Sequence, residues 1–163
     1  MPTLDDAFRL ESRGSFDYNI ETKSFPDKPQ YTPSPEAFAK LVLDKIREYK
    51  LERRIILQSF DFRTLVAMRK LAPEIRLSAL TETDTRDFTT IAKEAANAEI
   101  ISPEVKLVTP EKVAAAHAAG IQVVPWTADT PKEWDQLVRA KVDAIISDDP
   151  AELIAYLKQR GLR

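Results

Sequence analysis

Two charged residues near the start of the sequence are spaced so that their side chains could act together on one ligand. Glu21 and Lys23 lie two residues apart at the end of an apolar run, Tyr18 to Thr22. If that run is a strand, both side chains share one face and Thr22 points to the other. Glu21 could then give an oxygen to Mg²⁺ or Ca²⁺, and Lys23 could neutralise a phosphate oxygen. The alternative is a structural ion pair, and spacing alone does not decide between the two.

Aromatic residues end two of the later apolar runs. Phe60 follows Ile55 to Ser59, and Trp126 closes Gln122 to Trp126. Both are candidate walls of a binding site, although aromatic side chains more often fill a core, where they bury large apolar areas. Three acidic residues near helix starts are expected to serve as N-caps: Asp61, Asp84 and Asp149.

A lone histidine argues against acid–base chemistry by this chain alone. His117 is the only one, and it falls inside a helical pattern that starts at Thr109. One histidine cannot be both general acid and general base, and no G-x-S-x-G nucleophile motif accompanies it. We expect a structural or surface role for His117 and no catalytic residue in this chain.

Composition excludes several classes of protein. The 163 residues, 44% of them hydrophobic, suit a single domain over 1–163. A net charge of -2 without a basic stripe argues against nucleic-acid binding, and no apolar run is long enough to span a membrane. The absence of cysteine excludes disulfides, and three glycines are too few for a nucleotide-binding loop. The chain should be soluble, and its compartment stays open.

Repeated helix starts and short apolar runs predict an α/β fold. Four segments place Ser, Thr or Asp before a proline and an acidic first turn, beginning at Ser34, Thr109, Thr130 and Asp149. Three more helices are expected, from Thr3, from Asp61 and around Asp84 to Ala96. Six intervening runs read as strands: 18–22, 55–59, 75–79, 100–101, 122–126 and 144–147. This alternation predicts either an open parallel sheet or a (β/α)₈ barrel, and the count alone favours the open sheet.

Five motifs, in order along the chain, resemble the glycerophosphodiester phosphodiesterase family. Asn19-Ile20-Glu21-Thr22-Lys23 looks like that family's N-I-E-[IT]-K strand. The others are Met1-Pro2-Thr3-Leu4-Asp5-Asp6, Ile56-Leu57-Gln58-Ser59-Phe60-Asp61, His117-Ala118-Ala119-Gly120 with Val123-Val124-Pro125-Trp126-Thr127, and Val142-Asp143-Ala144-Ile145-Ile146-Ser147-Asp148-Asp149-Pro150. Lys141 and Ala144 depart from glycines of the family pattern, which leaves the local turn geometry open.

The resemblance implies a parallel (β/α) TIM barrel, incomplete at its N-terminal side, with about six strands present. It implies that Glu21 is a metal ligand, that Lys23 contacts phosphate, and that Phe60 and Trp126 lie near the glycerol side of the pocket. The implied cofactor is a divalent cation, Mg²⁺ or Ca²⁺. The implied reaction is hydrolysis of glycerophosphodiesters to glycerol 3-phosphate and an alcohol.

The same resemblance implies that this chain is inactive alone. The family's two catalytic histidines and its E-x-D metal ligands belong to segments expected before Met1. One alternative is a partial-barrel fragment or module that binds phosphoryl ligands without catalysis, and another is an unrelated open-sheet binding protein. Because an incomplete barrel leaves strand edges unpaired, we also expect self-association through those edges.

Overall fold

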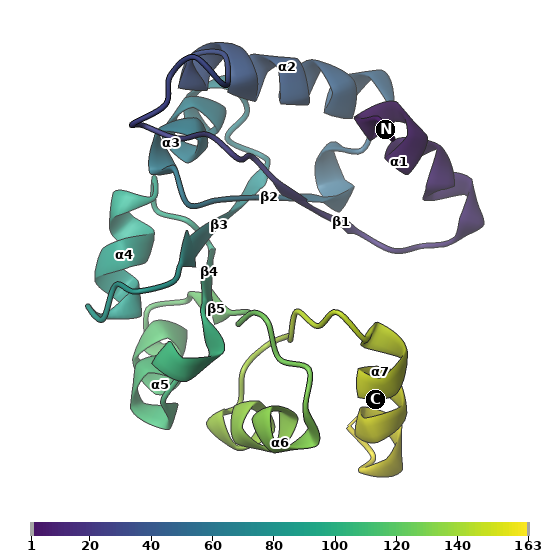
Figure 1. The fold of residues 1–163 in the computed structure, drawn as a ribbon, viewed down its shortest axis with the longest axis vertical. Coiled ribbons are helices and arrows are strands. Elements are labelled where there is room, and N and C mark those ends of the chain that lie inside the picture. Colours follow the sequence, from purple (N-terminus) through teal and green to yellow (C-terminus); the bar gives the residue numbers. More distant parts are fainter. Residues whose placement is uncertain (1, 163) are drawn as a thin grey trace. The chain divides into compact units, whose positions relative to one another are not determined.

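The computed structural model describes residues 2–162, which fall into two compact units, Met1–Ser78 and Ala79–Arg163. The strands follow one another in the order β1-β2-β3-β4-β5 (Figure 1). The pairings of β1 with β2 and of β4 with β5 are parallel. No helix among the described residues has the length and apolar character needed to cross a membrane.

The first unit begins with a capped helix and builds a two-layer arrangement around β1 and β2. Its elements are α1 (Leu4–Phe8), η1 (Arg9–Arg13), β1 (Tyr18–Glu21), α2 (Pro35–Glu48), η2 (Glu52–Arg54), β2 (Ile55–Ser59), α3 (Phe62–Leu71) and the start of β3 (Arg76–Thr81). Thr3 and Asp6 form a capping box on α1, and Ser34 caps α2 ahead of a proline at its first turn. The predicted helix starts are confirmed here.

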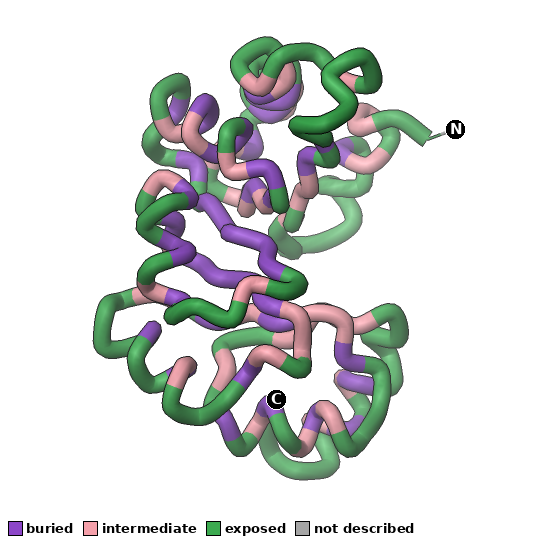
Figure 2. The backbone as a smooth tube through the Cα atoms, turned by 60° about the vertical axis from the view of Figure 1, so that its left-hand side comes forward, coloured by how far each residue is buried: buried purple, intermediate pink, exposed green. Residues whose placement is uncertain are grey.

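Apolar side chains of this unit meet between strand β2 and helices α2 and α3. Ile55 and Leu57 of β2 are buried, as are Ile46 of α2 and Leu65 and Met68 of α3. Figure 2 shows the buried stretches along the backbone. β1 pairs with β2 in a register that sets Glu21 opposite Gln58. The carboxyl ends of both strands therefore lie at one edge, as they must in a parallel pair.

The second unit continues the alternation of strands and helices. It contains the end of β3, then α4 (Phe88–Glu94), β4 (Ile100–Pro103), η3 (Val105–Leu107), α5 (Pro110–Ala118), β5 (Gln122–Val123), α6 (Pro131–Ala140) and α7 (Pro150–Gln159). Trp134 is fully buried, and its indole N–H donates to the carbonyl of Ala128 at 2.7 Å. Its ring meets that of Tyr156 edge-on at 5.1 Å, which joins α6 to α7.

In the second unit one predicted strand is wrong, and one turn that the sequence left open is settled. The segment 144–147 is extended but is not a regular strand, because Pro125 beside it has no N–H for the ladder. Instead, Asp143 donates to Val123 and Ile146 donates to Pro125. Lys141, which stands where the family pattern has glycine, adopts the left-handed conformation with φ 63°, so the turn keeps the geometry that glycine favours.

Two of the three predicted caps are confirmed and one is wrong. Asp61 and Asp149 accept hydrogen bonds from first-turn N–H groups of α3 and α7. Asp84 does not cap α4, which begins four residues later at Phe88. Asp84 instead accepts from the backbone N–H of Arg86 and pairs with its guanidinium at 2.7 Å. A short side chain cannot reach a helix that starts so far along the chain, so it closes a local turn.

The buried carboxylate of Asp61 ties the end of β1 to the start of α3. Ser24 donates to one of its oxygens at 2.8 Å, and the Arg63 guanidinium donates to both at 2.9 and 2.7 Å. Ser59 in turn accepts from the backbone N–H of Asp61. The hydrogen bonds from Arg63 hold the pKa of the Asp61 carboxyl below its usual value, although burial acts in the opposite direction.

We expect Asp61→Asn to lower the free energy of unfolding by about 1–2 kcal/mol at neutral pH, because charge-assisted hydrogen bonds are lost. A carboxyl with a lowered folded-state pKa stabilises the fold fully above its unfolded pKa of about 3.9 and loses that contribution as pH falls through the folded value. The difference between the two proteins in urea unfolding should therefore narrow as the pH is lowered from 7 to 3.

The matched control is Asp84→Asn, which removes a carboxylate paired with an arginine two residues later but 32% exposed. Its effect should be under about 1 kcal/mol, since exposed pairs contribute little. An equal cost at both positions would contradict a special role for the Asp61 network.

Candidate functional site

Glu21 and Lys23 meet at the carboxyl end of β1. The Lys23 ammonium lies 2.6 Å from a Glu21 carboxylate oxygen, and the two side chains are 69% and 22% exposed. On the neighbouring strand, Gln58 accepts a hydrogen bond from the Asn19 amide at 2.9 Å. The two side chains therefore share one side of this strand end, as the spacing predicted, and they pair with each other.

Thr22 fixes which way its neighbours face. It is buried, and its hydroxyl lies 2.8 Å from that of Thr64 on α3. Its backbone N–H donates to Gln58, and its carbonyl accepts from the Ser59 hydroxyl at 2.8 Å. Because side chains alternate along an extended chain, Glu21 and Lys23 point away from the helix that Thr22 contacts.

Phe60 and Trp126, the two candidate aromatic walls, have different surroundings. Phe60 directly follows β2 and is 45% exposed, so it does not fill the core of its unit. Trp126 belongs to the second unit and is half-buried, with its indole N–H donating to Ser102 at 2.8 Å. Trp126 forms a parallel bridge with Glu104, which places its backbone beside the end of β4.

The lone histidine makes a structural contact. The Nε2 atom of His117 lies 2.9 Å from a carboxylate oxygen of Asp143, and the backbone N–H of Val123 donates to the same oxygen at 2.7 Å. Asp143 thereby links the end of α5 to the end of β5. The sequence analysis did not predict this contact of Asp143. An acidic residue inside an otherwise apolar motif was the feature that could have indicated it. This geometry agrees with the structural role expected for His117.

The described residues do not complete a metal site by themselves. Among residues 2–162, no group of three or more His, Asp or Glu side chains is placed to hold one ion. Mg²⁺ and Ca²⁺ take six or more oxygen ligands, whereas the β1 end offers the single carboxylate of Glu21, already paired with Lys23. Glu21 can therefore be at most one ligand of a larger set.

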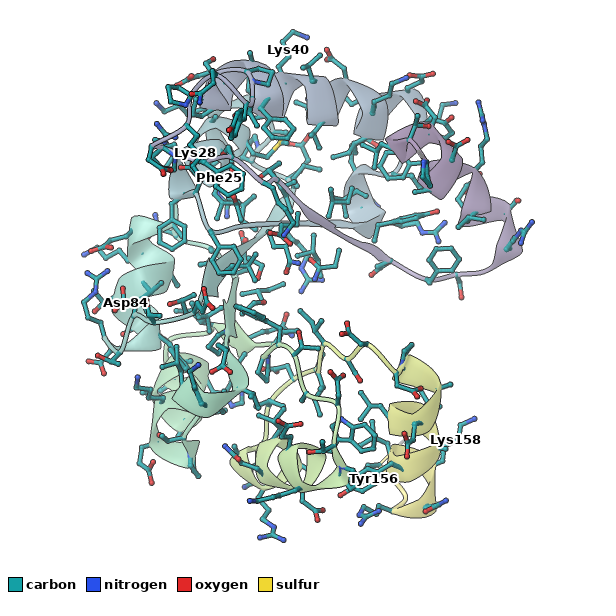
Figure 3. The ribbon with its side chains drawn as sticks, viewed as in Figure 1. Phe25, Lys28, Lys40, Asp84, Tyr156 and Lys158 are labelled. Atoms are coloured by element: carbon teal, nitrogen blue, oxygen red, sulfur yellow. The ribbon has the colours of Figure 1, made fainter. Side chains whose placement is uncertain are left out.

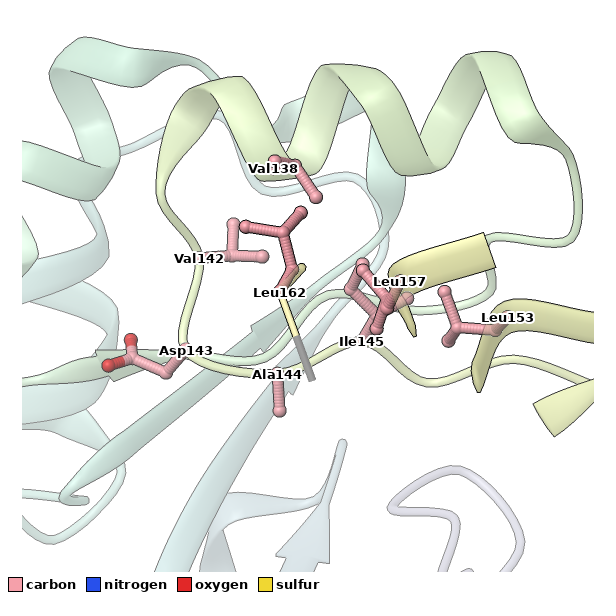
Figure 4. A pocket seen from close by; sticks show the side chains of 8 residues that line it. All are labelled: Val138, Val142, Asp143, Ala144, Ile145, Leu153, Leu157 and Leu162. Carbon is pink, nitrogen blue, oxygen red and sulfur yellow. The ribbon is translucent and has the colours of Figure 1, made fainter. Parts of the chain in front are cut away.

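A hollow of about 390 Å³ lies in the second unit, and no candidate site residue lines it. Figure 4 shows the side chains that line it, which are apolar except for the carboxylate of Asp143. The residues come from α6, α7 and the segments that flank them: Val138, Val142, Asp143, Ala144, Ile145, Leu153, Leu157 and Leu162. It holds no pair of groups for polar chemistry, so the candidate site remains the end of β1.

Known proteins resemble this chain over nearly its whole length. The model of the glycerophosphoryl diester phosphodiesterase family matches residues 1–152. A glycerophosphodiester phosphodiesterase from Caldanaerobacter subterraneus subsp. tengcongensis is 30% identical over 161 residues, which are 99% of this chain and 63% of that protein. The chain thus spans less than two thirds of the length of this curated relative.

Solved structures agree in fold. A crystal structure from Silicibacter pomeroyi, assigned as a glycerophosphoryl diester phosphodiesterase, is 27% identical with a TM-score of 0.84, over 98% of this chain and 56% of that one. A phosphodiesterase from Oleispira antarctica, solved with the product sn-glycerol-3-phosphate, is 19% identical with a TM-score of 0.82, over 96% of this chain and 61% of that one. The prediction of a parallel, barrel-type α/β fold is confirmed.

Three observations agree with one another: the order of the five motifs, the Glu21–Lys23 pair at the end of β1, and the family match over residues 1–152. The chain belongs to the glycerophosphoryl diester phosphodiesterase family.

Proposed function

We propose that this chain supplies the phosphate-binding side of a site that hydrolyses glycerophosphodiesters. The observation that carries the proposal is the Glu21–Lys23 pair, which is accessible at a strand end and lies within the family's motif. Lys23 holds a phosphoryl oxygen as a point charge, and Phe60 of the same unit contacts the glycerol. The Oleispira relative, solved with glycerol 3-phosphate, supports this choice of ligand.

Hydrolysis of the diester forms a bond from water oxygen to phosphorus and breaks the bond to the alcohol, which leaves with a proton. Lys23 would offset negative charge that develops on the phosphoryl oxygens in the transition state. Glu21 would orient the Lys23 ammonium and is proposed as one ligand of a divalent cation, Mg²⁺ or Ca²⁺. When bound, such a cation would polarise the phosphoryl oxygens. Since the described residues hold no complete cation site, this chain alone should bind cations weakly.

The exposure of the ion pair favours binding over a structural task. Lys23 is 69% exposed, and pairs in contact with water typically contribute about 0–1 kcal/mol to stability. The fold therefore has little need of this pair. Burial is instead found one residue away on either side, at Thr22 and Ser24, which hold the backbone in place.

A second candidate function is the binding of phosphoryl ligands without turnover. The observation that favours it is the contact of His117, the only histidine, with Asp143. No second histidine is present to act as its partner in proton transfer. Both candidates share the phosphate contact at Lys23 and differ only in whether the diester bond is broken.

Lys23→Met and Glu21→Gln test the site without disturbing the fold. Lys23→Met should weaken binding of sn-glycerol 3-phosphate about tenfold or more, because a charge-assisted contact is removed. Each change should alter the free energy of unfolding by less than about 1 kcal/mol. Calorimetric titration and urea unfolding measure the two quantities. Loss of stability with unchanged affinity would identify a structural pair instead.

Turnover separates the two candidate functions. The chain alone should release no glycerol 3-phosphate from glycerophosphocholine above background with Mg²⁺ or Ca²⁺, because each missing acid or base costs on the order of 10²- to 10⁴-fold. Joining the chain to the part of the Caldanaerobacter enzyme that the match leaves out should restore turnover. Glu21→Ala should abolish it again. Full activity of the chain alone, or an active joined protein with Glu21→Ala, would refute these roles.

A further inference from the structure

Segment 144–147 is hydrogen-bonded to a neighbouring segment on one side only, among the described residues. On that side the N–H of Ile146 donates to the carbonyl of Pro125 at 2.9 Å. The N–H groups of Ala144 and Ile145 have no hydrogen-bond partner within the part of the chain that the structure describes. The segment contains neither a charged residue nor a proline, which are the residues that usually keep an exposed strand edge from pairing. It can therefore accept a further strand.

The apolar hollow of the second unit lies beside this segment. Ile145 lines the hollow together with Leu153 and Leu157 of α7 (Figure 4). Ile145 and Leu157 are only half-buried, and Leu162, which also lines the hollow, is 53% exposed. Apolar area that stays in contact with water favours association with an apolar partner. A volume of about 390 Å³ leaves room for an apolar side chain from outside.

The charges that flank the segment decide how a second copy of the chain can pair with it. Asp143 precedes the segment and Asp148 follows it. A parallel pairing of two copies in register would set each of these carboxylates directly opposite its own equivalent, which is destabilising. An antiparallel pairing centred on Ile145 sets Asp143 opposite Ser147 and Asp148 opposite Val142, so that no like charges are opposed. The charge pattern therefore favours two copies that run antiparallel.

We propose that segment 144–147 joins two copies of this chain as an antiparallel pair of edge strands, related by a two-fold axis at Ile145. Directly opposed side chains share one face of a strand pair, so Ile145 of each copy lies beside Ile145 of the other and fills part of the other copy's hollow. Such a contact uses the same surface on both copies and closes on itself, so it gives a dimer and not a fibre. The proposal is independent of the phosphate contact, because neither Glu21 nor Lys23 belongs to this surface.

Sedimentation equilibrium of the full chain tests the dimer. The 18.4 kDa chain should reach twice that mass, with a dissociation constant of about 10–100 μM, because one short strand from each copy makes a small contact. Ile145→Lys should weaken the association about tenfold or more, because two ammonium groups would then lie opposite each other. The matched control is Leu41→Lys, which puts the same charge on an α2 residue that is 56% exposed and should leave the dimer unchanged.

The absence of cysteine from the chain allows a second test, which does not depend on a charge at the contact. Ile145→Cys sets two thiols opposite each other with Cα atoms about 5.5 Å apart, within the range that a disulfide spans. Mild oxidation should therefore give a covalent dimer. Lys158→Cys is the control, because Lys158 extends from the side of α7 that faces away from α6 (Figure 3) and should not cross-link.

Three results would overturn the proposal. One is a chain that stays monomeric up to about 500 μM, and another is a dimer that Ile145→Lys leaves unchanged while the variant unfolds in urea like the parent chain. Equal disulfide yields from Ile145→Cys and Lys158→Cys would show random encounter and would also overturn it. If a monomeric chain instead captures the part of the Caldanaerobacter enzyme that the match leaves out, this edge belongs to that segment, and the dimer is wrong.

Discussion

The candidate site depends on one buried carboxylate. Asp61 accepts hydrogen bonds from Ser24, from the first turn of α3 and from Arg63. These bonds join the chain that leaves β1 to the junction between β2 and α3. A buried charge is tolerated only where it is fully paired, and here the pairing also sets the backbone between Thr22 and Ser24. Lys23 lies inside that segment. The backbone that carries it is therefore held in place, although the side chain itself is exposed.

This arrangement separates the groups that stabilise from the groups that bind. The buried residues form hydrogen bonds with one another or with α3; they are Thr22, Ser24, Ser59 and Asp61. The residues that keep contact with water are Glu21, Lys23, Phe25 and Phe60. A binding residue needs accessible atoms on a backbone that does not move, and alternation along an extended chain delivers both from adjacent positions. The same division explains how a ligand could reach charge and aromatic surface without unfolding any element.

Local sequence rules predicted most elements because the signals were strong and short-range. Ser34 and Thr130 capped helices as expected, since an N-cap needs only its own first turn. The prediction that Asp84 caps a helix was wrong because helix caps and turns favour the same residue type. The irregular 144–147 segment depended on Pro125 in the segment that follows β5, and the Asp143–His117 contact joins residues 26 positions apart. Such pairings are tertiary, and the spacing of residues along the chain does not contain them.

The central claim is that phosphate binds at the end of β1, on the segment that Asp61 holds. Amide chemical shifts of the ¹⁵N-labelled chain, followed during titration with sn-glycerol 3-phosphate, test it most directly. We expect the largest shifts in residues 21–25 and 58–61, and we expect Lys23→Met to suppress them while the rest of the spectrum is unchanged. Saturable shifts confined to other parts of the chain, such as the hollow between α6 and α7, would contradict the account.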